Sequence, residues 1–268
     1  MVTALVVIAA LLVIYLLAIK GRTNNPDLKK FSEFDYAHRG LHSEGIPENS
    51  IAAFKAASDA GYGSELDVHL LKDGTLAIYH DSNLKRISGF DVTLEDLTHD
   101  DLKNYKLSGT EQTIPTLNEV LEIYDGKAPL VVELKAFRKN HNELSKAVCE
   151  LLDTYKGDYC IESFDPRVVR WFYKNRPEIV RGQLSQNFLK AEDKLPLLSK
   201  IVMTYSLLNF WNKPDFVAYN YDHKDCISNK LCQSFWGMQM VAWTIRSKEK
   251  HDDAKKSGWI SIFEKFLA

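Results

Sequence analysis

Hydrophobic residues follow two different patterns along the 268 residues of this chain. Residues 2–19 form an apolar run without a charged side chain, about the shortest length that crosses a bilayer as a helix. From residue 31 onward, short strand-like apolar runs alternate with segments whose apolar residues recur at helical spacing. We therefore expect a transmembrane anchor at 1–20, a polar linker at 21–30 and a globular domain at 31–268.

The alternation within the globular domain predicts its fold class. Eight runs resemble strands, and helical segments such as ENSIAAFKAASDAG and NELSKAVCELLDTY separate most of them. Eight such strands fit an α/β protein of the TIM-type (β/α)8 barrel class. An open doubly wound sheet is the alternative, although no G-x-G-x-x-G turn follows the first strand. The expected strands are DYAHRG (35–40), SELDVHLL (64–71), TLAIYHD (75–81), APLVVELKA (128–136), YCIESFD (159–165), EIVRGQLS (178–185), DFVAYNY (215–221) and QMVAWTIRS (239–247).

The flanks of the N-terminal apolar run indicate a retained single-pass membrane anchor. A cleaved signal peptide is the alternative, but no basic residue precedes the run and no small-x-small cleavage pattern follows it. Basic residues follow the run instead, beginning with Lys20 and Arg22. The positive-inside rule then predicts that the globular domain lies on the cytoplasmic side of the membrane.

Charge and cysteine content exclude several classes of function. The net charge is −2 and the sequence pI is about 6.5, so no overall basic field favours nucleic acid as a partner. The four cysteines match neither a zinc-site spacing nor a CxxC motif. They are expected to be core thiols in a reducing compartment, with a Cys226–Cys232 disulfide as the alternative.

Ionisable residues occur on four consecutive strand candidates. Side chains at i and i+2 of a strand share a face, and the C-terminal ends of barrel strands surround the mouth where chemistry takes place. We therefore expect these side chains to meet at one rim. They are His38 and Arg39 on the first strand, Glu65 and Asp67 on the second, His80 and Asp81 on the third, and Glu133 and Lys135 on the fourth.

The chemistry of this set indicates a metal and an anionic substrate. Three carboxylates at one mouth repel one another unless a cation neutralises them, and ligation by oxygen alone favours a hard ion such as Mg²⁺ or Ca²⁺. Arg39 and Lys135 beside that ion would bind a phosphate group. His38 and His80 could then transfer protons on either side of a phosphodiester.

An ordered set of motifs resembles the glycerophosphodiester phosphodiesterase family. The set spans the chain from about Tyr36 to the last expected strand, and it is specific as an ordered set although each motif is weak alone. The matching segments are His38-Arg39-Gly40, Pro47-Glu48-Asn49-Ser50, Glu65-Leu66-Asp67, Lys72-Asp73-Gly74, His80-Asp81, IPTLNEVL (114–121), VVELK (131–135), SFDP (163–166) and, more weakly, WTI (243–245).

The resemblance implies a TIM-type barrel that hydrolyses glycerophosphodiesters to glycerol 3-phosphate and an alcohol, with one divalent cation, Mg²⁺ or Ca²⁺ with Mn²⁺ as a third option. It also implies that a neighbouring glycerol hydroxyl of the substrate attacks phosphorus, and it implies a role for each matching residue. The implied roles are His38 and His80 as the acid–base pair, Glu65, Asp67 and Glu133 as metal ligands, Arg39 and Lys135 as phosphate or substrate contacts, and Glu48 near the metal or the substrate hydroxyls.

Some positions leave alternatives open. His69 shares a face with Glu65 and Asp67 and is either a rim residue that contacts substrate or part of an exposed loop. Trp243 either stacks on substrate or fills the mouth. Glu162 adds a carboxylate of undetermined direction. The ending GWISIFEKFLA differs from the Thr–Asp–Lys/Arg–Pro turn that is frequent in the family, which leaves barrel closure open.

Three functions are consistent with these residues. The first is hydrolysis of small glycerophosphodiesters, and the second is lysophospholipase D or sphingomyelinase D-like cleavage of a lipid phosphodiester. The third is a catalytically silent, membrane-tethered binding module. Replacing His38 or His80 distinguishes the enzymes from the binding module, since only an enzyme has turnover to lose.

Overall fold

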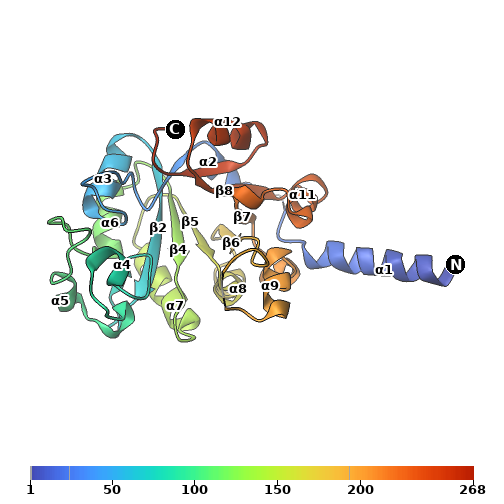
Figure 1. Cartoon of the computed structure of the whole chain (residues 1–268), viewed down its shortest axis with the longest axis horizontal. Coiled ribbons are helices and arrows are strands. Elements are labelled where there is room, and N and C mark those ends of the chain that lie inside the picture. Colours follow the sequence, from blue (N-terminus) through green and yellow to red (C-terminus); the bar gives the residue numbers. More distant parts are fainter. Residues whose placement is uncertain (1, 24, 193) are drawn as a thin grey trace.

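A closed barrel of parallel strands forms the centre of the structure (Figure 1). The computed structural model describes residues 2–23, 25–192 and 194–268. Neighbouring strands pair in the order β1-β9-β8-β7-β6-β5-β4-β2, and pairing between β1 and β2 closes the barrel. The TIM-type fold is thus confirmed. Its strands are β1 (Tyr36–His38), β2 (Gly63–Leu70), β4 (Leu130–Leu134), β5 (Tyr159–Ser163), β6 (Arg181–Ser185), β7 (Phe216–Asn220), β8 (Gln239–Ile245) and β9 (Ile260–Phe263).

The expected third strand is not part of the barrel. Residues Leu76–Ile78 form β3, which pairs antiparallel with β2 as a hairpin. The connection from Leu70 to Leu76 is too short for the crossover that a parallel partner requires. The eighth barrel strand is β9, in the C-terminal segment whose role was left open, and it pairs in parallel with β1 and β8.

Helices connect most of the barrel strands, as the sequence pattern predicts. The loop region after β3 carries only short helices, whereas longer helices cover the outside of the barrel (Figure 1). The helices are α1 (Val2–Ala18), α2 (Leu28–Ser32), α3 (Ile51–Asp59), α4 (Lys85–Ser88), η1 (Leu94–Asp96), α5 (His99–Leu102), α6 (Leu117–Tyr124), α7 (His141–Leu152), α8 (Pro166–Asn175), α9 (Leu197–Thr204), α10 (Asn209–Asn212), η2 (Tyr221–His223), α11 (Ile227–Ser234) and α12 (Lys248–Lys256).

Helix α1 projects away from the barrel, and its side chains are almost all exposed (Figure 1). At its C-terminal end Ile19 is buried, and the Trp236 indole donates a hydrogen bond to the Leu16 carbonyl over 2.9 Å. The expected helix is confirmed. Among the residues that the structure describes, however, no helix has both the length and the apolar character needed to span a membrane.

The segment expected to be a polar linker packs against the barrel. The Arg22 guanidinium pairs with the buried Asp215 carboxylate, and the Arg22 amide donates a hydrogen bond to the Pro214 carbonyl over 2.8 Å. Residues Leu28–Ser32 form α2, whose Phe31 is buried among residues of the barrel strands. Arg22 and α2 therefore pack against the barrel.

Alternation along the strands separates the inside of the barrel from the outside. Leu66, Val68 and Val132 pack against the surrounding helices in one hydrophobic cluster. A second cluster consists almost entirely of residues from the barrel strands. Gly63 leaves room in this interior, since a Cβ atom there would lie 2.6 Å from the Tyr36 ring. The interior is thus apolar below the mouth.

Candidate active site

The strand register brings the predicted site residues to one level at the mouth. His38 lies beside Glu65 in the pairing of β1 with β2, and Asp67 lies beside Glu133 in the pairing of β2 with β4. Glu133 in turn lies beside Glu162 of β5. These side chains follow the apolar inner residues at i+2 spacing, so they continue the inner face of the barrel into its open end.

One small cavity, of about 40 Å³, brings together most of the predicted residues. Both histidines, His38 and His80, line it although they come from separate segments. The side chains of Asp67, Lys135 and Glu48 do not line it but contact residues that do. The lining residues are His38, Arg39, Glu65, His80, Glu133, Glu162, Phe164, Leu184, Trp243 and Ile262.

Three buried carboxylates form the negative centre of the mouth. Glu65, Asp67 and Glu133 each offer one oxygen, and these atoms lie within 4.8 Å of one another. Burial raises the pKa of Glu65 well above its usual range, and the carboxylates of Asp67 and Glu133 raise it further. Burial also raises the pKa of Asp67, but the Lys135 ammonium and the Arg39 guanidinium outweigh it and hold that pKa well below its usual range.

This donor set fits a divalent cation. Glu65 is 2% exposed, and its Oε1 atom has no hydrogen-bond partner within the described part of the chain. A buried carboxylate oxygen without a partner is costly, and it gains a partner when a hard cation binds. Glu65, Asp67 and Glu133 are therefore the residues that would hold Mg²⁺, Ca²⁺ or Mn²⁺.

Two basic side chains lie against the carboxylates. Lys135 Nζ is 2.9 Å from Asp67 Oδ1 and 2.7 Å from Glu133 Oε1. Arg39 Nε is 3.4 Å from Asp67 Oδ2, and Arg39 bonds Glu48 Oε1 over 2.7 Å. A lysine and an arginine at the edge of a carboxylate cluster can both bind an anion that approaches a cation there.

The loop after β1 contributes a residue that the sequence did not single out. The buried Asn49 side chain donates a hydrogen bond to Asp67 Oδ2 over 2.8 Å. Arg39 and Asn49 both have positive φ, at 56° and 54°, and the Asn49 amide bonds the Arg39 carbonyl over 2.9 Å. The Pro–Glu–Asn–Ser motif thus folds a tight loop whose asparagine orients a carboxylate of the cluster.

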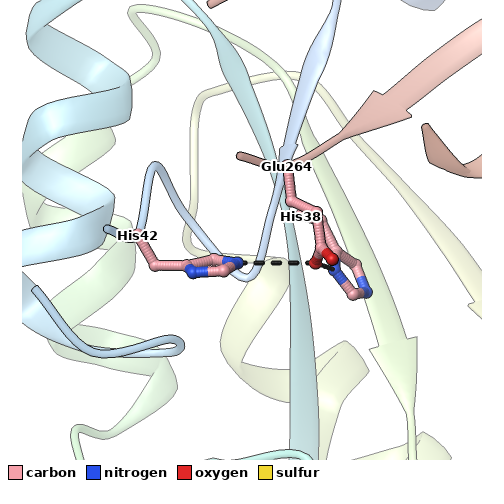
Figure 2. A group of neighbouring side chains, drawn as sticks. All are labelled: His38, His42 and Glu264. Atoms are coloured by element: carbon pink, nitrogen blue, oxygen red, sulfur yellow. Dashed lines mark hydrogen bonds and ion pairs between the residues drawn. The ribbon is translucent and has the colours of Figure 1, made fainter. Parts of the chain in front are cut away.

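His38 is held by a carboxylate of the C-terminal segment. His38 Nδ1 lies 2.6 Å from Glu264 Oε2, and His42 Nε2 lies 3.5 Å from the same oxygen (Figure 2). Burial lowers the pKa of His38 to about 4, despite the hydrogen bond that its ring donates to Glu264. The His42 side chain is likewise largely buried.

Glu264 was missed by the sequence analysis. It continues the alternation of Ile260 and Ile262, two inner residues of β9. The same pattern, an apolar inner residue followed two positions later by a carboxylate, occurs at Val131 and Glu133. This periodicity was the signal that could have identified Glu264 as a residue of the mouth.

His80 is held by its neighbour in sequence. His80 Nδ1 lies 2.5 Å from Asp81 Oδ1, and Arg86 Nε lies 2.6 Å from the other oxygen of Asp81. Arg86 also bonds both oxygens of Glu48, over 2.7 and 3.1 Å. Arg86, which the sequence analysis did not identify, therefore links the His80 side of the mouth to Glu48.

His69 lies at a buried position of β2 and not in an exposed loop. It is 1% exposed, and its Nδ1 atom is 2.7 Å from Glu95 Oε1. Its Nε2 atom is 3.3 Å from the His80 carbonyl oxygen. The exposed-loop expectation is therefore wrong, whereas a contact with substrate stays a prediction, and His69 supports the backbone of His80.

Trp243 and Glu162 both reach the mouth. The Trp243 ring packs edge-on against Phe164 at a centroid distance of 5.6 Å, so it fills part of the wall. Glu162 is buried and faces the cavity, and burial together with the Glu133 carboxylate raises its pKa well above the usual range.

A parallel barrel whose open end combines clustered carboxylates, a pair of histidines and basic side chains is typical of enzymes that cleave phosphate esters. Sequence comparison then identifies the group within that class. The chain belongs to the glycerophosphoryl diester phosphodiesterase family, whose family model matches residues 38–266. It is therefore a phosphoric diester hydrolase by family.

Individual relatives agree with this assignment. A glycerophosphodiester phosphodiesterase from Caldanaerobacter subterraneus subsp. tengcongensis is 32% identical over 238 residues, which cover 83% of this chain and 89% of the relative. A lysophospholipase D from Rattus norvegicus is 34% identical over 144 residues, which cover 49% of this chain and 44% of the relative.

Solved structures share the fold. A glycerophosphodiester phosphodiesterase from Thermotoga maritima has a TM-score of 0.66 and 26% identity, and the match covers 86% of this chain and 93% of that one. An Oleispira antarctica phosphodiesterase, solved in complex with the product sn-glycerol-3-phosphate, has a TM-score of 0.72 and 23% identity over 86% of this chain and 92% of that one.

Proposed function

We propose that this chain hydrolyses glycerophosphodiesters to glycerol 3-phosphate and an alcohol by acid–base catalysis at the barrel mouth. The observation that supports this most is that His38 and His80 line one cavity together with Arg39, Glu65 and Glu133. Proton transfer on both sides of a phosphodiester requires two such groups around one binding position.

The two histidines receive different roles in this proposal. His38 is neutral near pH 7, because burial lowers its pKa to about 4, and its Nδ1–H bonds Glu264. Its Nε2 atom is then free to accept the proton of the attacking hydroxyl, from water or from the neighbouring glycerol group. His80, whose Nδ1 atom is held by Asp81, donates a proton to the leaving alcohol oxygen.

The basic residues would bind the substrate's phosphate directly, and the carboxylates would bind it through a cation. Arg39 and Lys135 lie at the edge of the cluster. The Arg39 guanidinium would bind two phosphate oxygens at once, and the Lys135 ammonium would bind as a compact positive charge. Glu48 keeps Arg39 in place through their 2.7 Å ion pair. Glu65, Asp67 and Glu133 would hold a divalent cation, which would supply positive charge that polarises the phosphoryl group.

The test is an assay of the full chain on glycerophosphocholine, glycerophosphoethanolamine and glycerophosphoglycerol. We expect His38→Ala and His80→Ala each to lower kcat by at least about 100-fold, since general acid–base groups contribute about that much. EDTA should abolish turnover. His99→Ala, at an exposed histidine remote from these contacts, serves as the matched control and should leave kcat unchanged.

Two results would contradict the proposal. Turnover by both histidine variants within about threefold of the wild-type chain would show that neither imidazole transfers a proton. Absence of turnover on every substrate by the metal-loaded wild-type chain would favour the silent binding module instead.

A second candidate function, cleavage of lysolipid phosphodiesters, is favoured by a groove beside the site. This groove has a volume of about 590 Å³, and its walls are mostly apolar. One wall is His42, which contacts Glu264, the carboxylate that holds His38. The rat relative is named a lysophospholipase D. The lining residues are Leu41, His42, Ser43, Glu44, Ile46, Ala56, Lys265, Phe266 and Leu267.

A single substitution tests whether the groove takes an acyl chain. Ala56 lies on α3 at the wall, and Ala56→Phe should fill part of the groove. Because each buried methylene is worth about 0.8 kcal/mol, we expect kcat/KM for lysophosphatidylcholine to fall at least about tenfold. The value for glycerophosphocholine should stay unchanged. Ala147→Phe, at a half-buried position of α7, is the control. An equal effect on both substrates would contradict the lipid assignment.

We also propose that α1 attaches the chain to a membrane. The support is that α1 has 17 residues, none of them charged and none of them buried against the barrel. Lys20, just beyond the helix, lies over the Trp236 ring at 4.2 Å from its centroid. A tryptophan and a lysine at the end of an apolar helix are typical of the membrane–water boundary. Under the positive-inside rule the barrel lies on the cytoplasmic side.

A further inference from the structure

The carboxylate that holds His38 is itself held in place from three directions. Glu264 Oε2 lies 2.6 Å from His38 Nδ1, and Glu264 Oε1 lies 2.7 Å from Arg246 Nε. The Glu264 amide donates to the Ile245 carbonyl over 2.9 Å, which fixes the backbone. Glu264 is 8% exposed, so its carboxylate is only slightly screened by water.

The two histidines of the mouth are therefore held by the same kind of contact at Nδ1. At His80, Asp81 bonds Nδ1 through one oxygen and an arginine Nε through the other, just as Glu264 does at His38. Asp81 follows His80 directly in sequence, whereas Glu264 comes from the other end of the barrel domain. The same arrangement is thus built once locally and once by closure of the barrel between β1 and β9.

We propose that Glu264 is a positioning residue of the reaction, which Arg246 holds so that His38 carries its proton on Nδ1 and presents Nε2 to the carboxylate cluster. A carboxylate can only accept from an imidazole, so the short contact at Nδ1 fixes the tautomer. His38 Nε2 then lies 3.9 Å from Glu65 Oε2, at the centre of the mouth. The inference rests on the proposed function, in which His38 is the base.

The same three side chains have ligand types that zinc accepts. His38, His42 and Glu264 offer two imidazoles and one carboxylate whose ligand atoms lie within 4.8 Å of one another (Figure 2). However, the 2.6 Å separation of His38 Nδ1 and Glu264 Oε2 is that of a charge-assisted hydrogen bond. Arg246 already bonds the second oxygen of Glu264. The geometry therefore favours a hydrogen bond over a second metal site.

The main test replaces the carboxylate with an amide of the same shape. Glu264→Gln lacks the charge, and its amide N–H can donate to Nδ1 and so favour the other tautomer of His38. The wrong tautomer of His38 would slow the chemical step without weakening substrate binding. We therefore expect kcat to fall at least about 30-fold, with KM within about threefold of the wild-type value. Glu264→Asp keeps the charge and should recover part of kcat. Glu111→Gln, at an exposed glutamate paired with Lys106, is the matched control.

Nitrogen NMR of the imidazoles gives a readout that does not depend on activity. In the metal-free wild-type chain, the His38 signals, assigned by comparison with His38→Ala, should report the Nδ1–H tautomer. In Glu264→Gln this tautomer should lose its dominance. Should Glu264→Gln fail to fold, Arg246→Met, at a side chain that is 51% exposed, should shift the same signals and lower kcat to a smaller extent.

Each outcome either supports or overturns the proposal. The proposal would be overturned if Glu264→Gln kept the kcat of the wild-type chain. It would also be overturned if the His38 signals did not respond to Glu264→Gln or to Arg246→Met. Stoichiometric zinc binding that removes the Nδ1–H signal in the wild-type chain, but not in Glu264→Gln, would replace it with a metal site. The wild-type chain could also lack turnover while its His38 is still the Nδ1–H tautomer. That result would refute the proposed function but would support the positioning of His38 by Glu264.

Discussion

Arg86 connects two carboxylates that serve different residues of the mouth. Through Asp81 it supports His80, and through Glu48 it supports Arg39, which would bind the phosphate. Burial raises the pKa of Asp81, but bonds from His80 and Arg86 outweigh it and lower that pKa. Arg86 and Arg39 likewise lower the pKa of Glu48 against the effect of burial.

These depressed pKa values predict how stability depends on pH. The unfolded chain binds more protons at Glu48 and Asp81 than the folded chain, so their contribution exists above about pH 4 and is lost as the pH falls further. Arg86→Gln should therefore cost about 1 kcal/mol at neutral pH, a modest value because the arginine is 45% exposed. This difference should shrink toward pH 3.

Urea unfolding at several pH values measures this effect. Arg138→Gln removes an arginine from an exposed pair with Asp96 and should change stability much less at every pH. A cost for Arg86→Gln that is the same at acidic and neutral pH would contradict the assignment of these ion pairs.

Several site residues could be predicted from the sequence because local rules determine their direction. Glu65, Asp67 and Glu133 follow strand periodicity, and their convergence on one centre follows from a parallel register. Glu264 and Arg86 could not be predicted in the same way, since their partners lie far away in sequence or in an irregular loop. His69 was misplaced because the hairpin with β3 covers a position that an open rim would expose.

At the scale of elements, one connection was decided by its length and not by its composition. The turn between β2 and β3 is too short for a crossover, so an apolar run that looks like a barrel strand becomes a hairpin. The C-terminal segment, whose part in barrel closure was left open, provides the eighth strand β9 and carries the chain to Glu264. Strand candidates must therefore be counted together with the length of their connections.

Helix α1 gives a prediction of its own. Because its apolar surface is exposed, we expect the full chain to float with liposomes of neutral and anionic lipids in a density gradient. Replacing Leu5, Ile8 and Leu12 with glutamine should abolish flotation without affecting the barrel, which α1 contacts only at its base. Exchanging the same residues for Ile, Leu and Ile keeps the apolar surface and is the control. A wild-type chain that stays with the soluble fraction would contradict membrane attachment.

At the scale of the whole molecule, the residues that stabilise the barrel and the residues of the site occupy different levels of its interior. The inner layer below the mouth is apolar and includes Phe31 of α2, whereas the open end collects charges that burial makes costly. Lys135 and Arg39 offset part of that cost, and Glu65 Oε1 remains without a partner among the described residues. This imbalance is what a bound cation would remove.

Calorimetric titration of Mg²⁺, Mn²⁺ and Ca²⁺ into the EDTA-treated full chain tests the central claim most directly. We predict one ion bound per chain, with binding lost or weakened at least about tenfold in Glu65→Gln, because that change removes a charged ligand. His38→Ala should still bind the ion, since His38 is not among the ligands. A wild-type chain that binds none of the three ions, or Glu65→Gln with unchanged affinity, would contradict the account.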